Sequence, residues 1–222
     1  MKVKLISSTQ GADGKNLLEQ VAYTARVSNP ANQNNDASAE KLVRYLVKNR
    51  HWSPLEMVNV CLEIETTRDI ARQILRHRSF SFQEFSQRYA VADLGFEIRE
   101  ARLQDTKNRQ NSIEITTEDI YTSDHAAQLV NSWRNKQESL ISHAKETYNW
   151  AIEHGVAKEQ ARAVLPEGMT VSRLYMNGTL RSWLHYIQIR SDAATQKEHR
   201  EIAIACADAI EPIFPMIKEF TS

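Results

Sequence analysis

The hydrophobic positions in the first third of the chain follow two different periods. Val3 and Leu5 alternate with lysines and predict a short opening strand. Apolar residues then recur at helical spacing over 17–25 and again over 42–47. The clearest alternation covers residues 58–66, where every second side chain is apolar. The pattern predicts a strand, two helices and a second strand, in that order.

Two shorter helical segments are predicted on either side of the second strand. Ser53 is a typical N-cap residue, Pro54 suits the first helical position and Glu56 the third, so a helical turn is expected there. After the strand the period changes at Thr67, because apolar residues recur at helical spacing up to Leu75. This helix leads directly into a segment rich in arginine.

The rest of the chain is dominated by helical patterns. Residues 101–123 are polar and without a firm period, which predicts an excursion over the surface. A long amphipathic helix is expected over 124–154, where Gly155 ends it. With no internal repeat, the sequence predicts a single α+β domain over residues 1–222 with a helix-rich C-terminal half. The remaining predicted elements are a helix that ends before Pro166, a strand over 169–176, and helices over 179–190 and 197–210.

Composition and charge exclude several classes of protein. The 28 lysines and arginines balance the 28 aspartates and glutamates, so no overall charge draws the chain to nucleic acid or to a membrane surface. Cys61 and Cys206 are far apart, which provides neither a disulfide framework nor a zinc motif and suits a reducing cytoplasm. The N-terminus lacks the apolar length of a signal peptide, and no segment has the length of a membrane span. We therefore expect a cytoplasmic protein without membrane or nucleic-acid partners.

Residues 68–90 form a local cationic cluster, with five arginines against two acidic side chains. Arg68, Arg72 and Arg76 are four residues apart, so a helix would place them on one stripe. Guanidinium groups offer paired donors to phosphate oxygens, and Glu84 could accept from an N–H or O–H of a ligand. A solvated helix face is the common explanation of such a stripe, but it usually interleaves lysine with glutamate. The segment therefore favours an anion site.

A second candidate cluster comprises Arg162, Arg173, Arg181 and Arg190, with His185 and Gln188 close to Arg181 in the predicted helix over 179–190. Arg181, His185 and Gln188 share one face by their spacing, whereas Arg190 lies off this face and receives no role from spacing alone. Without further information, His185 is interpreted as a histidine packed beside neighbouring aromatic residues.

P-loop, dinucleotide-binding and nucleophile-elbow motifs are absent from the sequence. No metal site is expected, because the histidines show no HExxH pattern and the cysteines form no cluster.

The arginine-rich segment also resembles a known family. The run RHR at 76–78, followed after seven residues by Ser86, matches the RHRx7S signature of the flavin-dependent thymidylate synthases. The resemblance extends in family order from about His51 to about Arg200. Its further blocks are SPLE after His51, ARQILRHR, SQRY, ARAVLP, and LRSWLH through Arg190. The chain departs from the family pattern at three positions, Met57, Gln83 and Thr179.

The resemblance implies a role for each residue that matches a family motif. Arg190 would be the catalytic residue, close to the uracil, where a guanidinium group favours the ionised or polarised ring. The residues implied at the dUMP site, with arginines on the phosphate, are Gln73, Ile74, Leu75, Arg76, Glu84, Phe85, Ser86, Gln87, Arg88 and Arg162. The residues implied at FAD are Ser53, Arg76, His77, Arg78, Glu84, Thr179, Leu180, Arg181 and His185.

The same resemblance implies the reaction, the fold and the partners. The enzyme would convert dUMP to dTMP with methylenetetrahydrofolate as carbon donor and FAD as hydride source, recharged by NADPH. The implied fold is a central, mostly antiparallel sheet flanked by helices, in a homotetramer whose sites are shared between subunits. The cysteine-dependent thymidylate synthase adds a thiolate to its substrate, but Cys61 is predicted mid-strand and Cys206 among apolar helix residues. Ser86 has no evident general base beside it, so a binding hydroxyl is expected.

Two other functions are kept as alternatives. The first is a nucleic-acid-binding module that sets the arginine helix against phosphates, although the neutral net charge argues against it. The second is an FAD- or nucleotide-binding paralogue without methyl transfer. The joint presence of Ser86, Arg162 and Arg190 argues against this second alternative.

Overall fold

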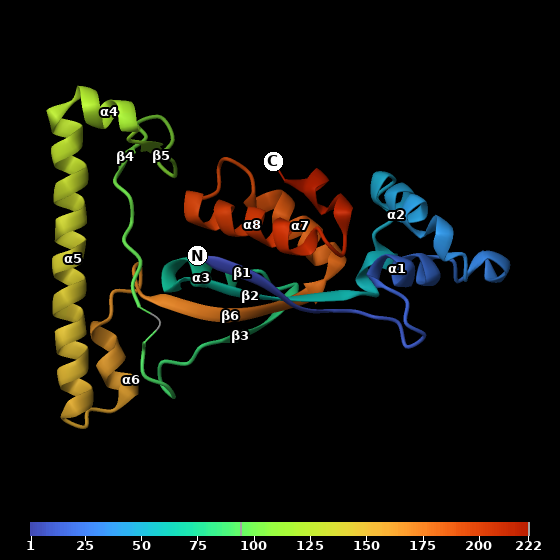
Figure 1. Cartoon of the computed structure of the whole chain (residues 1–222), viewed down its shortest axis with the longest axis horizontal. Helices are drawn as coiled ribbons and strands as arrows, with labels where there is room; N and C mark the ends of the chain where they lie inside the picture. The colour runs from blue at the N-terminus through green and yellow to red at the C-terminus, as the bar shows by residue number, and fades with distance from the viewer. Residues whose placement is uncertain (94, 222) are drawn as a thin grey trace. The chain divides into compact units, whose positions relative to one another are not determined.

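The computed structural model describes residues 1–93 and 95–221, and its contacts group the chain into two compact units (Figure 1). Unit 1 comprises Met1–Glu65, Gln73–Gln83 and Arg173–Ser222. Unit 2 comprises Thr66–Arg72 and Glu84–Ser172. The expected single domain over residues 1–222 remains a prediction, and each unit has elements and packing of its own.

A four-stranded sheet in the order β1-β2-β6-β3 has most of its residues in unit 1. β1 and β2 pair antiparallel, with Leu5 opposite Leu62 and Val3 opposite Ile64. The antiparallel sheet and the α+β class are confirmed, as are the strands predicted at the chain start, over 58–66 and over 169–176. β3 is a strand that the hydrophobic pattern does not predict, because its few residues directly follow the RHR turn. The bounds are β1 (Lys2–Ser8), β2 (Asn59–Thr67), β3 (Phe80–Glu84) and β6 (Val171–Thr179).

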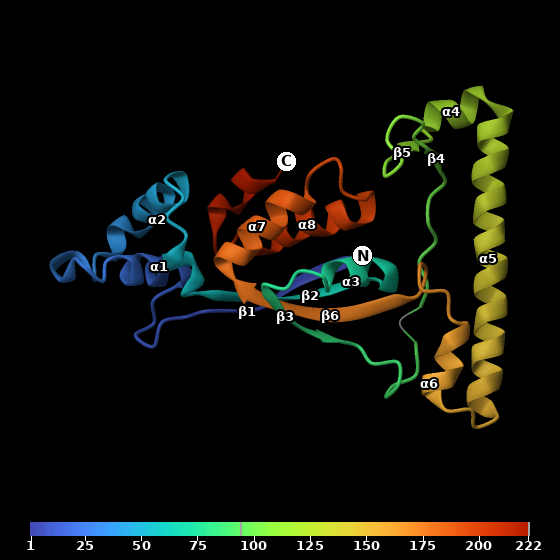
Figure 2. The same cartoon turned by 180° about the vertical axis from the view of Figure 1, so that it is seen from behind.

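One face of this sheet is apolar and is covered by two helices of unit 1. In β2 the side chains of Val60, Leu62 and Ile64 are fully buried, as the alternation predicts. The helices α7 (Leu180–Arg190) and α8 (Lys197–Ile210) lie over this sheet (Figures 1 and 2). Trp183 of α7 is also fully buried, and its indole N–H donates to the carbonyl of Val60 at 2.9 Å. This bond fixes α7 to β2.

The N-terminal helices of unit 1 form where helical spacing predicts them. Asn16 caps the first of them through a capping box with Glu19. The turn at Ser53 is helical as predicted, but Ser53 is its first residue and not its cap, since Trp52 occupies the N-cap position. The bounds are α1 (Leu17–Ala25), α2 (Ala39–Lys48), and the 3-10 helices η1 (Pro30–Asn32), η2 (Asp36–Ser38), η3 (Ser53–Glu56) and η5 (Pro215–Phe220).

The helix α3 (Arg68–Ile74) ends earlier than the arginine spacing suggested. Arg76 lies beyond its end, in a turn, and is exposed. The expected continuous stripe of three arginines is therefore wrong, because only Arg68 and Arg72 belong to the helix.

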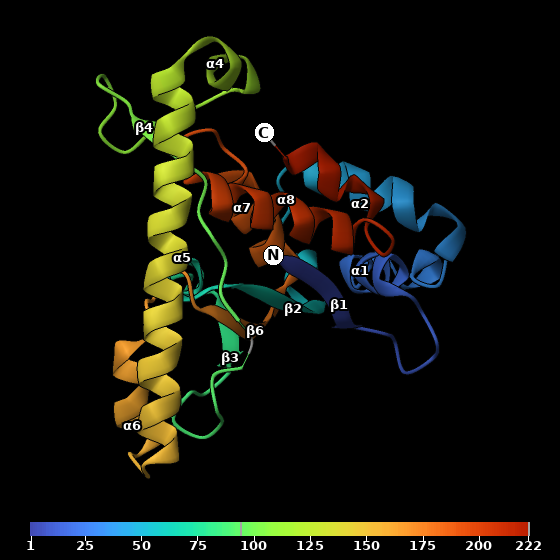
Figure 3. The same ribbon diagram turned by 60° about the vertical axis from the view of Figure 1, so that its left-hand side comes forward.

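The helix α5 (Asp124–Glu153) is the longest element of unit 2, and its bounds agree with the prediction (Figure 3). Ser123 caps its start, and Gly155 follows its end with a φ of +76°, in the left-handed region that favours glycine. Tyr148, Ala151 and Ala161 form a small buried cluster between α5 and α6. The two short helices after α5 are α6 (Lys158–Ala161) and the 3-10 helix η4 (Arg162–Val164).

Residues 101–123 form the predicted excursion of unit 2, and every one of them is exposed or half-buried. The segment contains a short hairpin of β4 (Arg102–Gln104) and β5 (Ser112–Glu114), and then α4 (Thr117–Thr122). The hydrophobic pattern does not show these elements, because they are short and carry few apolar side chains. None of the helices in the described ranges is long and apolar enough to cross a membrane.

Candidate active site

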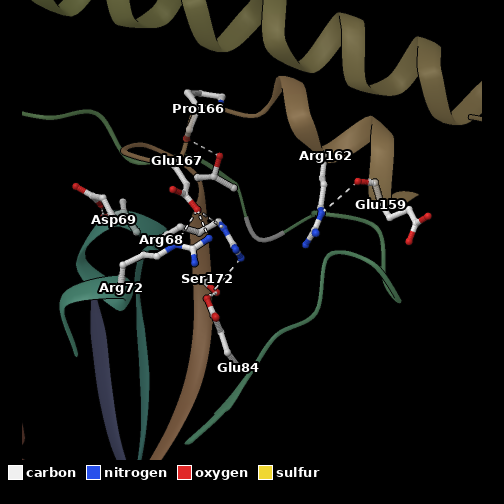
Figure 4. Close-up of polar contacts among 11 residues, drawn as sticks. Arg68, Asp69, Arg72, Glu84, Glu159, Arg162, Pro166, Glu167 and Ser172 are labelled. Atoms are coloured by element: carbon white, nitrogen blue, oxygen red, sulfur yellow. Dashed lines mark hydrogen bonds and ion pairs between the residues drawn. The ribbon is translucent and has the colours of Figure 1, made fainter. Parts of the chain in front are cut away.

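The two arginines of α3 contact carboxylates of unit 2 (Figure 4). Arg72 donates to Oε1 of Glu167 from Nε at 3.0 Å and from Nη2 at 2.6 Å. Arg68, which is largely buried, places Nε 3.6 Å from the same oxygen. The hydrogen bond from Arg72 lowers the pKa of the Glu167 carboxyl. The sequence suggested that few carboxylates neutralise these arginines. Glu167 was missed because it comes from a distant segment of the chain.

Glu84, at the end of β3, is held on one side by residues of unit 2 (Figure 4). The hydroxyl of Ser172 donates to Oε1 of Glu84 at 2.9 Å, and Nη1 of Arg68 lies 3.5 Å from the same oxygen. Ser172 is fully buried in β6, so it is a fixed donor. Both of these contacts are made to Oε1, so they leave Oε2 of Glu84 unused. This second oxygen can accept an N–H or O–H of a ligand.

The other predicted dUMP residues of unit 2 follow Glu84 or lie in η4. Arg88 is exposed, with Nε 3.7 Å from a carboxylate oxygen of Glu159. Arg162 donates from Nε to the main-chain carbonyl of Glu159 at 3.3 Å (Figure 4). Both guanidinium groups therefore lie beside one residue. Phe85 is half-buried, Ser86 is exposed and Gln87 is buried. Arg88 and Arg162 thus provide two cationic groups in one part of unit 2.

In unit 1 the structure joins the RHR run to the end of α7. Arg190 donates from Nε to Nε2 of His77 at 2.9 Å, across 113 positions of sequence. The ring of His77 packs edge-on against Tyr186, with ring centroids 4.9 Å apart. Burial lowers the pKa of His77 to about 4, with smaller contributions from the charges of Arg190 and His185. A neutral His77 can accept from Arg190, which leaves Nη1 and Nη2 of Arg190 for other partners.

A cavity of about 690 Å³ in unit 1 contains the predicted face of α7. Arg181, His185 and Gln188 all line it, which confirms that they share one face. His185 is exposed toward this cavity, so the interpretation of a packed histidine is wrong. Arg181 forms an ion pair with Glu56 at 2.5 Å. The other lining residues are Val47, Lys48, Arg50, Trp52, Ser79, Ser182, Leu184 and Phe220.

The remaining predicted contacts lie at other positions in unit 1. Ser53, Arg76 and Arg78 are exposed. Thr179 is the N-cap of α7, where its hydroxyl accepts from the N–H of Ser182 at 3.2 Å. Gln73 is half-buried at the end of α3, followed by Ile74 and Leu75. Ile74 and Leu180 are fully buried in the core, so their main chains and not their side chains are available to a ligand.

His199 of α8 is a buried group close to His77 and Arg190 that the sequence did not indicate. Its exposed fraction is 0%, and burial, followed by Arg190 and His77, lowers its pKa to about 3. Its position in an apolar helical pattern gave no signal of a polar contact, because the partners come from α3 and α7.

Acid is expected to weaken the fold through these two buried histidines. The folded pKa values of His77 and His199, about 4 and about 3, lie below the usual 6.5, so the unfolded chain binds more protons between these values. The free energy of unfolding should therefore fall as the pH is lowered from about 7 to about 5, a window above the titration of most carboxylates. Urea unfolding at several pH values measures this slope. The double variant His77→Asn, His199→Asn should flatten it, and an equally steep slope in that variant would contradict the assignment.

The two cysteines have the properties expected of structural residues. Burial raises the pKa of Cys206, which is fully buried in α8, and it also raises the pKa of Cys61 in β2. An attacking thiolate needs a lowered pKa, so neither cysteine is activated as a nucleophile.

Groups of three or more side chains that could hold a metal ion are absent from residues 1–93 and 95–221.

Comparisons with known proteins identify the family of this chain. Residues 4–216 match the family model described as thymidylate synthase complementing protein. The chain is 46% identical over 219 residues to the probable flavin-dependent thymidylate synthase of Paramecium bursaria Chlorella virus 1, covering 98% of this chain and 97% of the relative. It is 45% identical over 223 residues to the flavin-dependent thymidylate synthase of a Synechocystis strain, with the same two coverages.

A solved structure has a similar fold. The UMP/dUMP methylase PolB from Streptomyces cacaoi, bound with 5-Br dUMP, superposes with a TM-score of 0.76 at 26% identity. The superposition covers 99% of this chain and 93% of that structure. The resemblance found in the RHRx7S segment is confirmed over almost the whole sequence, and the chain belongs to the thymidylate synthase complementing protein family, that of the flavin-dependent thymidylate synthases.

Proposed function

We propose that this protein is a flavin-dependent thymidylate synthase that converts dUMP to dTMP, with methylenetetrahydrofolate as carbon donor and FAD as hydride source. The observation that carries the proposal is the hydrogen bond between Arg190 and His77. It joins the RHR run to the terminal arginine helix, two blocks of the family pattern that are far apart in sequence.

The cavity of unit 1 has the side chains that part of an FAD molecule requires. Lys48, Arg50 and Arg181 supply cationic groups for phosphate oxygens, while Trp52 and Phe220 supply flat apolar surface for a ring system. When bound, reduced FAD supplies the hydride that no protein side chain can provide. The other predicted FAD contacts, including Ser53, Thr179 and His185, remain part of this proposal.

The residues proposed at dUMP have different roles according to their charge. Arg88 and Arg162 would bind the phosphate, since both guanidinium groups lie beside Glu159 and are within reach of solvent. Glu84 would accept a ligand N–H or O–H at its second oxygen. Arg190 would stabilise negative charge on the uracil ring as C5 reacts, because its two Nη groups are not engaged by His77. The same reaction needs no cysteine nucleophile, in agreement with the raised pKa values of Cys61 and Cys206.

We further propose a homotetramer that uses NADPH as reductant and works in the cytoplasm. The outer surface of α5 supports an assembly, since Trp133, Leu140 and Trp150 expose 42%, 51% and 57% of their surfaces. Large apolar side chains on one helix are typical of a surface that packs against another subunit. Sedimentation velocity tests the assembly, and a purely monomeric protein at working concentrations would remove it from the proposal.

The decisive experiment is an absorbance spectrum of the purified protein followed by an assay for dTMP. Bound flavin together with dTMP formed from dUMP, methylenetetrahydrofolate and NADPH establishes the function. Bound FAD without dTMP favours the paralogue without methyl transfer. Colourless protein that cannot be reconstituted with FAD, and that binds DNA in a salt-dependent way, favours the nucleic-acid-binding alternative.

A further inference from the structure

His199 of α8 is the centre of a hydrogen-bonded chain of side chains in unit 1. Its Nε2 lies 3.2 Å from the hydroxyl of Tyr186, and its Nδ1 lies 3.2 Å from Oε1 of Gln73. The imidazole is fully buried, and burial lowers its pKa to about 3, so the ring is neutral near pH 7. A neutral imidazole has one donor and one acceptor nitrogen. The partners of the two nitrogens therefore decide which tautomer is present.

Glu198 sets the direction of this chain from its outer end. A carboxylate only accepts, so Gln196 donates from Nε2 to Oε2 of Glu198 at 2.9 Å. The amide oxygen of Gln196 is then left to accept from Nε2 of Gln73 at 2.8 Å. This orientation turns the amide oxygen of Gln73 toward His199, whose Nδ1 must carry the proton.

The other nitrogen of His199 agrees with this direction. Nε2 accepts from the hydroxyl of Tyr186, and burial raises the pKa of Tyr186, so that its hydroxyl keeps the proton. Both ends of the chain thus select the same tautomer. Gln73 has one N–H engaged by Gln196 and its oxygen engaged by His199, which leaves the second N–H of its amide as a donor.

We infer that His199 is a positioning residue which, together with Tyr186, holds the amide of Gln73 so that its remaining N–H donates to a carbonyl oxygen of the pyrimidine ligand. The inference rests on the proposed function, which places Gln73 at dUMP. Without the donor at His199, the amide of Gln73 loses one of the two partners that fix its orientation, so its remaining N–H is aimed less firmly at a carbonyl oxygen. His199 acts on substrate recognition through Gln73 and needs no contact with the ligand.

Calorimetric titration of dUMP into the FAD-loaded protein tests this role, because binding requires no turnover. His199→Leu removes both hydrogen bonds and is expected to raise the Kd for dUMP about tenfold, the effect of one well-placed hydrogen bond. His199→Asn retains an amide donor near the position of Nδ1 and should recover most of the affinity. Ile202→Val trims a fully buried side chain of the same helix outside the chain of hydrogen bonds, so it should leave the Kd unchanged.

The tautomer provides a second measurement that a merely structural role would not move. In a nitrogen-15 spectrum of histidine-labelled protein, the proton of His199 is expected on Nδ1, and Tyr186→Phe should redistribute it between the two nitrogens. A proton on Nε2 in the wild type, or an unchanged Kd in folded His199→Leu protein, overturns the inference. Wild-type protein that binds no dUMP overturns the proposed function and this inference with it, whereas normal wild-type binding assigns any failure to the inference alone.

Discussion

Replacing Arg190 by lysine is expected to lower kcat for dTMP formation by about 100-fold or more, the usual effect of losing one preorganised donor to developing charge. The guanidinium group is held through Nε on His77 at 2.9 Å, so its two Nη groups have a fixed direction. A lysine keeps the positive charge but has a single ammonium group, which cannot hold on to His77 and present paired donors at the same time. Steady-state assays at saturating dUMP and folate, with FAD content measured in parallel, quantify the loss.

Arg200→Lys is the matched control for this variant. Arg200 lies in the following helix α8 and contacts the carbonyl of Ala193 through Nη1 at 3.4 Å, outside the proposed site. This variant should keep the wild-type kcat. If Arg190→Lys also keeps kcat, positive charge alone is sufficient, and the geometric role of the contact with His77 is wrong.

Much of the fold follows from hydrophobic period. The alternation over 58–66 and the amphipathic pattern over 124–154 correspond to β2 and α5 almost residue by residue, because each pattern is long enough to separate strand from helix. Hydrophobic period does not predict β3 or the hairpin of β4 and β5. They consist of three to five residues each and depend on pairing with distant strands or with each other.

The site was predictable to a different extent. The family motifs indicated Arg190 and Arg181, while spacing alone gave Arg190 no role, since its partner His77 lies in another segment. Partners of the charged residues were not predictable at all. Glu167 and His199 lie outside the family motifs found in the sequence. Their contacts with Arg72 and Gln73 exist only after the chain has folded. Family motifs therefore indicate which groups are proposed to face a ligand, whereas the residues that hold those groups in place emerge only from the fold.

Arg181→Glu is expected to weaken FAD binding about 100-fold. The variant loses a cationic donor at the cavity and adds a carboxylate that repels the phosphates of FAD. Arg181 lines the cavity of unit 1 and pairs with Glu56 at 2.5 Å, so the variant would place a second carboxylate beside Glu56. Both groups are partly exposed, and the defect should shrink at high salt because solvent ions screen such charges. Flavin fluorescence titrations at low and high salt measure the Kd and its salt dependence.

Arg44→Glu separates a local effect from a change in overall charge. Arg44 is exposed to the same degree as Arg181, 47% against 48%, and it also forms a surface ion pair, with Glu219 at 2.7 Å. It does not line the cavity, so its reversal changes the net charge equally while leaving the cavity wall intact. A selective loss of FAD in the Arg181 variant would place the cofactor phosphates at this wall. Equal losses in both variants would mean that FAD responds to the general field of the protein, and the cavity would then lose its assignment as the FAD site.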